Sequence, residues 1–164
     1  MAYSTIADLI ELAIQIENAC QALYENMEKK FSYTPEIAAY WHRYAAEEAG
    51  HARWLENLRA RSTVEQLEQK ASADILLHAQ KMIIFSSSQA DKNIGDLEDA
   101  YEIADELENS ETNAVFEFLI ANYAGDQSTA SFLRTQLKAH VANLQNNLPI
   151  AYRSRLARRS LKAL

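Results

Sequence analysis

Apolar residues recur every three or four positions along most of the chain, which is the period of amphipathic helices. The clearest case follows Thr34-Pro35, where a capping residue is followed by proline at the first helical position. A helix is therefore predicted from Pro35 to about Arg61. Its stripe has the core-facing pattern of a bundle helix. The stripe consists of Ile37, Trp41, Tyr44, Glu48, His51, Leu55 and Leu58.

Similar stripes predict three more long helices. The first begins after a cap at Ser4 or Thr5 and runs to about Lys30. The third is predicted to be one continuous helix that begins after Asp96 and ends at the Gly125-Asp126 break, and the fourth follows that break to about Asn147. The stripe expected on the third helix consists of Leu97, Tyr101, Ala104, Glu108, Glu111, Val115, Phe118 and Asn122.

The segment 62–95 lies between the second and third long helices and is less regular. Val64 to Gln69 predict a short helix, and Ala73 to Phe85 predict another, which the serines at 86–88 are expected to weaken. A segment of this length is too long for a tight hairpin, so it is predicted to cross the bundle from end to end. The fold class is all-α: a four-helix bundle with a long crossover of short helices between helices two and three.

Composition fits one soluble domain rich in helix. The chain has 164 residues, 48% hydrophobic, with only three Gly and two Pro. A net charge of −7 disfavours nucleic acid as a partner. The single Cys20 leaves no internal disulfide and no Cys-x-x-Cys metal site. No signal pattern and no membrane-length apolar run is present, so a cytoplasmic protein without membrane contact is expected.

Two ionisable residues interrupt the apolar stripe of the second helix. Glu48 and His51 lie three positions apart, on one face of the helix and one turn from each other. A carboxylate and an imidazole placed in this way can hold one metal ion. Burying an unpaired charge costs several kcal/mol, so the pair requires either a metal or a structural partner. Glu47 lies off the stripe and is predicted to be at the surface.

The two halves of the chain resemble each other, which extends the pattern to the other helices. Residues 11–18 are similar to residues 102–109, and this aligns Glu17 with Glu108. A nearly equal offset aligns Glu48 and His51 with Leu137 and His140. A pseudo-twofold arrangement would bring these acids and imidazoles together in the middle of the bundle.

This pattern resembles the ferritin-like superfamily, and within it the four-helix bundle of rubrerythrins. Ferritin-like di-iron proteins take a Glu from each of two helices and a Glu-x-x-His from each of the other two. The resemblance covers roughly residues 5–147 and lacks the Cys-rich rubredoxin-like module of many rubrerythrins. It implies two iron ions, with manganese as the alternative metal. The implied ligands are Glu17, Glu48, His51, Glu108, Glu111 and His140.

The chain departs from that family pattern at Leu137, where the fourth helix should carry a glutamate. Glu111 lies one turn beyond Glu108, where rubrerythrins have a second carboxylate, so it is predicted to compensate. Tyr44 and Tyr101 are predicted to orient a ligand carboxylate or bound oxygen. The implied activity is reduction of peroxide or O₂, or oxidation of Fe(II), with electrons from a separate donor or from incoming Fe(II).

The alternative function is a bundle whose site has degenerated to one metal or none and which acts as a structural or interaction protein. In this case the buried acids would pair among themselves. As structural residues, Glu17 and Glu108 would each pair with an imidazole or a tyrosine hydroxyl. The predicted domain covers residues 1–151, and residues 152–164 form a basic tail that is solvated or docks a subunit. A homodimer is the expected assembly.

Overall fold

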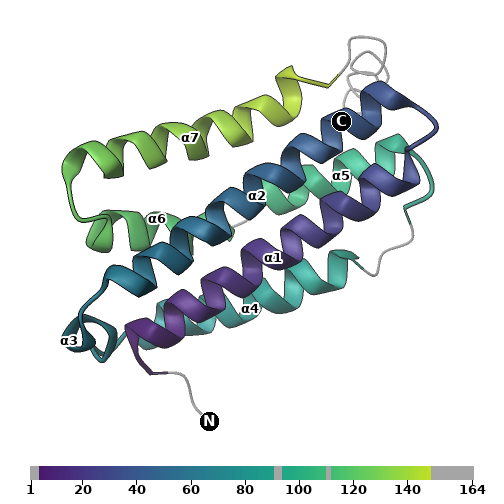
Figure 1. The fold of residues 1–164 in the computed structure, drawn as a ribbon. Helices are drawn as coiled ribbons and strands as arrows, with labels where there is room; N and C mark the ends of the chain where they lie inside the picture. Colours follow the sequence, from purple (N-terminus) through teal and green to yellow (C-terminus); the bar gives the residue numbers. More distant parts are fainter. Residues whose placement is uncertain (1–3, 91–93, 110–111, 149–164) are drawn as a thin grey trace, which may run out of the picture.

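The computed structural model describes residues 4–90, 94–109 and 112–148. Within these residues the chain forms seven helices, and no β-strand is present beyond an isolated bridge between Thr5 and Lys70. The two longest helices, α1 (Ile6–Lys30) and α2 (Pro35–Arg61), pack side by side as an antiparallel pair (Figure 1). The all-α prediction is confirmed.

Local sequence signals explain where these two helices begin. Thr5 accepts a hydrogen bond from the backbone N–H of Asp8, whose carboxylate in turn accepts one from the Thr5 backbone N–H, forming a capping box. Helix α2 begins at Pro35 as predicted, but the Thr34 hydroxyl makes no capping hydrogen bond. The fixed φ of proline is therefore the effective start signal there.

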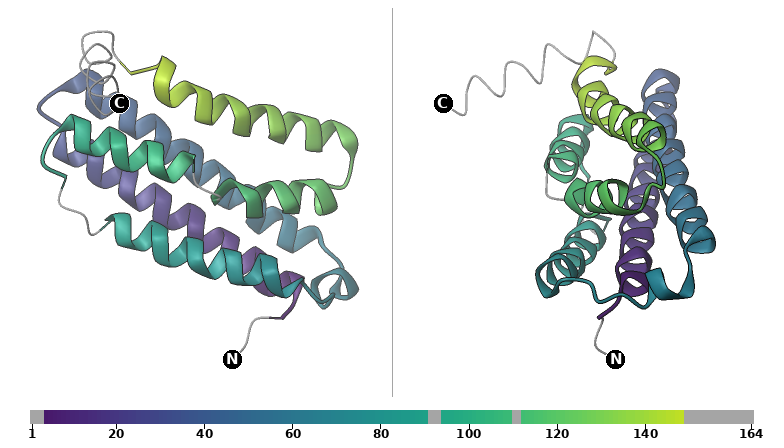
Figure 2. Two further views of the ribbon diagram at one scale, coloured as in Figure 1. Left: turned by 180° about the vertical axis from the view of Figure 1, so that it is seen from behind. Right: turned by 90° about the vertical axis from the view of Figure 1, so that its left-hand side faces the viewer.

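The crossover between the second and third bundle positions is also confirmed. It contains the short α3 (Val64–Leu67) and the longer α4 (Ala73–Ala90), which packs against α1 (Figures 1 and 2). Helix α4 continues through the serines that were expected to weaken it. The buried Ser86 hydroxyl lies 4.0 Å from the Cys20 thiol, and the Ser88 hydroxyl donates to the carbonyl of Phe85. Hydroxyls satisfied in this way do not compete with the helix.

The third bundle position is two helices and not the single helix predicted from sequence. Helix α5 (Leu97–Glu108) ends at Asn109, and α6 (Thr112–Tyr123) follows. The Asn109 side chain donates to the backbone carbonyl and carboxylate of Asp105 and so closes the last turn. The interruption changes the buried face of α6. That face contains Val115, Phe116, Leu119 and Ile120, whereas Phe118 is only half-buried and Asn122 is exposed.

Helix α7 (Gln127–Asn146) completes the bundle and begins after the predicted Asp126 cap. Its buried residues include Leu137, His140 and Leu144. No helix in the described part of the chain combines the length and the apolarity needed to cross a membrane. The predicted tail at 152–164 lies outside the described residues, so the domain boundary at 151 stays a prediction.

Candidate metal centre

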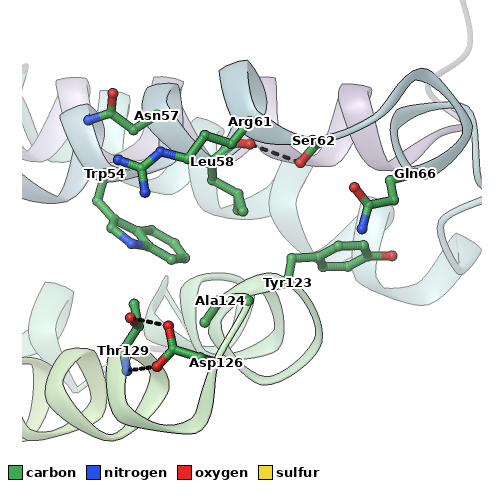
Figure 3. Close-up of a pocket in the computed structure, with 11 residues that line it drawn as sticks. Trp54, Asn57, Leu58, Arg61, Ser62, Gln66, Tyr123, Ala124, Asp126 and Thr129 are labelled. Atoms are coloured by element: carbon green, nitrogen blue, oxygen red, sulfur yellow. Dashed lines mark hydrogen bonds between the residues drawn. The ribbon is translucent and has the colours of Figure 1, made fainter.

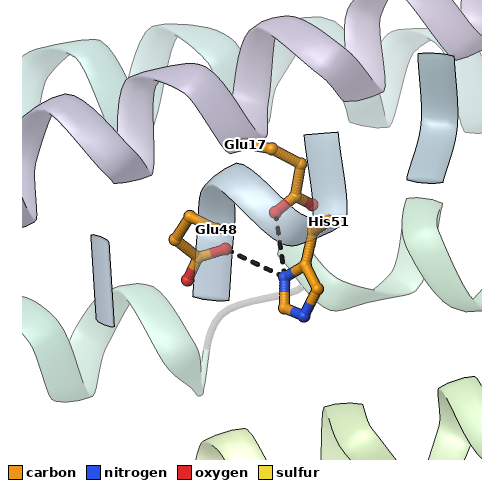
Figure 4. A group of neighbouring side chains, drawn as sticks. All are labelled: Glu17, Glu48 and His51. Carbon is orange, nitrogen blue, oxygen red and sulfur yellow. Dashed lines mark hydrogen bonds and ion pairs between the residues drawn. The ribbon is translucent and has the colours of Figure 1, made fainter. Parts of the chain in front are cut away.

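The first group of potential ligands joins α1 to α2. Glu17 projects from α1, and Glu48 and His51 project from successive turns of α2 toward it (Figure 4). Nδ1 of His51 lies 3.3 Å from Oε2 of Glu17 and 3.0 Å from Oε2 of Glu48. These three side chains each offer one ligand atom within a space that could hold one metal ion.

The second group joins α2 to α5 and α7. Nε2 of His140 lies 2.9 Å from Oε1 of Glu48 and 2.9 Å from Oε1 of Glu108. Glu48, Glu108 and His140 therefore form a second set of clustered ligand atoms. Glu48 belongs to both groups, with one carboxylate oxygen facing each imidazole. This is the arrangement expected of a carboxylate that bridges two ions.

The five residues are nearly removed from solvent. Glu17, Glu48, Glu108 and His140 are each at most 6% exposed, and the side chain of His51 is 14% exposed. Two imidazoles therefore face three buried acidic side chains. A structural role for these residues and a role as metal ligands both require them to lie close together. Their proximity therefore does not by itself distinguish the two roles.

Burial and mutual charge perturb these groups strongly. Burial raises the pKa of Glu17 to about 8, against an opposing hydrogen bond from His51. Burial also acts to raise the pKa of Glu48, but the charges and hydrogen bonds of His140 and His51 outweigh it and hold that pKa well below its usual range.

The pKa values of both imidazoles are raised. Burial acts to lower the pKa of His51, but the hydrogen bonds that His51 donates to Glu17 and Glu48 overcome it and raise the pKa to about 10. The same competition raises the pKa of His140, through Glu48, Glu108 and Glu47. Both imidazoles therefore carry a proton near neutral pH when no metal is bound.

The donor set is suited to iron or manganese. Carboxylate oxygens are hard ligands and imidazole nitrogens are intermediate, a mixture that favours these ions over those that prefer sulfur. Among the described residues, Cys20 is the only cysteine near the group, and burial together with the charges of Glu48, Glu17 and Glu108 raises the pKa of its thiol. A neutral buried thiol is a poor ligand and a poor nucleophile.

The structure brings together Glu17, Glu48, His51, Glu108 and His140, as the internal repeat predicted. Their role as metal ligands stays a prediction. Glu111 lies outside the described residues, so its predicted compensation for Leu137 is not tested. Leu137 is buried one turn before His140 on α7, and that turn supplies no carboxylate.

The two tyrosines predicted to act in the site, Tyr44 and Tyr101, differ in what they contact. The Tyr44 hydroxyl donates to the backbone carbonyl of His140, and the two rings lie 4.8 Å apart between centroids. Tyr44 therefore contacts a site imidazole and not a carboxylate. Tyr101 is half-buried, and its hydroxyl bonds to none of the five site residues in the described structure. The predicted role of both residues, to orient a ligand carboxylate or bound oxygen, stays a prediction.

Two residues in contact with the site were missed from sequence. The hydroxyl of Tyr24, which was assigned to core packing, donates to Oε1 of Glu108 at 2.5 Å. Glu47 was assigned to the surface and is 39% exposed, but its Oε2 lies 2.6 Å from Nδ1 of His140. The available signals were the position of Tyr24 two turns beyond Glu17, on the same stripe, and the adjacent acids at 47 and 48.

Replacing Tyr24 by phenylalanine is expected to lower the free energy of unfolding of the metal-free protein by about 1.5–3 kcal/mol, the usual range for a hydrogen bond to a charged group. The lost hydroxyl leaves the buried Glu108 carboxylate with one donor fewer. Denaturant unfolding measures the change. Tyr33→Phe is the control because Tyr33 is 77% exposed, and equal stability of the two variants would contradict the assignment.

Aromatic side chains close the site on two sides. The ring of Phe116 lies 5.1 Å from that of His51, and Trp54 packs on Phe116 at the same centroid distance. Beyond Trp54, a cavity of about 340 Å³ opens between the end of α2 and the α6–α7 turn (Figure 3). None of the five site residues lines this cavity, so it is distinct from the candidate metal centre.

The helical bundle and its central carboxylate–histidine cluster define a protein of the ferritin-like class. The chain belongs to the Rubrerythrin family, whose family model matches residues 8–123. The matched range includes Glu17, Glu48, His51 and Glu108 and ends before α7, so His140 lies outside it. No curated protein and no solved structure matches the chain.

Proposed function

We propose that this protein binds two iron ions, one held by each group, and that Glu48 would contribute to both sites. Glu17 and His51 would complete the first site, and Glu108 and His140 would complete the second. The observation that carries the proposal is the sharing of Glu48 between two carboxylate–histidine groups from four helices. Manganese is the alternative ion, because it accepts the same ligands.

The chemistry implied by this site is reduction of peroxide or O₂, or oxidation of Fe(II). Iron bound there would supply the two electrons that, with two protons, reduce one hydrogen peroxide to two waters. The chain's own residues hold the site in shape: Tyr24 orients Glu108 through its hydroxyl, and Tyr44 holds the backbone of His140. The surrounding aromatic rings restrict access of water to the buried carboxylates.

Turnover would require electrons from outside the site. We propose that they come from a separate donor or from incoming Fe(II). A homodimer is the proposed assembly. Light scattering coupled to size-exclusion chromatography measures it directly.

Metal analysis after expression or refolding with iron tests the proposal. Wild-type protein is expected to retain two ions, and His51→Ala is expected to lose the ion held with Glu17. An element-specific anomalous signal between Glu48 and the two imidazoles would identify the metal. Protein that retains only traces of iron or manganese, with no change on replacing His51, would contradict the proposal.

The second candidate is a degenerate site that holds one ion or none. One observation favours it: Leu137 stands where a carboxylate is expected. If no ion is bound, the melting temperature would not respond to a chelator. A large rise in metal content on Leu137→Glu would also favour this candidate, because it would show that the missing carboxylate limits binding.

A further inference from the structure

We propose that Glu47 is a positioning residue for His140, and that it partly replaces the carboxylate that α7 lacks at Leu137. This inference rests on the proposed function, because it concerns the second of the two proposed metal sites. Glu47 would act through the imidazole and not as a ligand. It is absent from both groups of clustered ligand atoms.

The geometry separates the two sides of the His140 ring. Nε2 faces the potential ligands Glu48 and Glu108, at 2.9 Å from each, whereas Nδ1 lies 2.6 Å from Oε2 of Glu47. An imidazole that binds metal through one nitrogen must donate from the other, and a carboxylate there fixes its tautomer and orientation. Glu47 and Glu48 are adjacent on α2, about 100° apart around the helix. They can therefore reach opposite sides of the same ring.

The two partners of this contact differ in burial. His140 is 2% exposed, whereas the side chain of Glu47 is 39% exposed. The 2.6 Å separation is typical of a short, charge-assisted hydrogen bond. Such a bond increases the electron density of the imidazole, so Nε2 becomes a stronger ligand.

The two proposed metal sites differ in this feature. His51 uses Nδ1 toward its ligand carboxylates, and no described carboxylate contacts its Nε2. The carboxylate of Glu47 therefore contacts His140, the imidazole on α7, which is also the helix that carries Leu137. That helix supplies no carboxylate of its own in the turn before His140. The negative charge missing from α7 is partly restored by Glu47 from α2.

Titration with Co(II), followed by its visible spectrum, tests this inference on the full chain. Glu47→Ala is expected to weaken one of the two sites by about 10–100-fold, the usual effect of losing an outer partner of a metal ligand. The other site should keep its affinity and its spectrum. Glu47→Gln should restore part of the loss, since its amide oxygen still accepts from Nδ1. Glu56→Ala is the control, an exposed acid on the same helix.

A second variant tests whether the Glu47 carboxylate replaces the carboxylate that α7 lacks at Leu137. Leu137→Glu is expected to rescue the weakened site in the Glu47→Ala background, and to improve affinity less when Glu47 is present. Equal gains in both backgrounds would overturn this part of the inference. Two unchanged sites in Glu47→Ala, or equal weakening of both, would overturn the positioning role alone. Wild-type protein that binds no cobalt would overturn the proposed function as well.

Discussion

Replacing Glu48 by alanine is expected to remove both metal ions, whereas His51→Ala should principally cost one. The reason is the sharing of Glu48, whose Oε2 faces His51 and whose Oε1 faces His140. Without it, each group keeps one carboxylate and one imidazole, too few to hold a divalent ion tightly. Metal content after iron loading and desalting measures the result.

The same substitution should destabilise the metal-free protein, because it leaves two buried imidazolium groups short of a counter-charge. Removing one partner of a buried ion pair typically costs about 3–5 kcal/mol. Glu48→Gln preserves the side-chain volume and separates loss of charge from loss of packing. Circular dichroism shows whether each variant is folded. A folded Glu48→Ala protein that retains one ion would contradict the bridging role.

Metal affinity is expected to rise steeply with pH. In the metal-free protein the pKa of Glu17 is raised to about 8 and that of His51 to about 10, and the pKa of His140 is also raised. All three groups therefore carry a proton between about pH 6 and 7, and a metal ion must displace it. Releasing about three protons makes the overall constant for two ions rise about 10³-fold per pH unit.

Calorimetric titration of Co(II) in buffers of different ionisation enthalpy counts the released protons. His51→Ala should lower that count by about one and flatten the pH dependence accordingly. His42→Ala is the matched control because His42 is an exposed histidine on the same helix, paired with Glu28. Affinity that does not vary with pH would show that the metal binds away from these imidazoles.

Much of the fold could be predicted from the sequence because its helices are long and strongly periodic. The stripes of α1 and α2, the proline at position 35 and the Asp126 cap locate three of the long helices closely. The break after Glu108 could not be predicted from that periodicity, since acids and apolar residues continue through it in helical spacing. It depends on how the Asn109 side chain satisfies the preceding turn.

For the candidate site, sequence by itself determined which ionisable residues interrupt an apolar stripe. Because a helix repeats every 3.6 residues, that information assigns Glu17, Glu48, His51, Glu108 and His140 to the interior. Only the tertiary structure decided which atoms meet. Contacts between helices depend on crossing geometry and rotamers, and neither is encoded in spacing along one helix. For that reason the sharing of Glu48, the hydroxyl of Tyr24 on Glu108 and the contact of Glu47 with His140 appear only in the folded bundle.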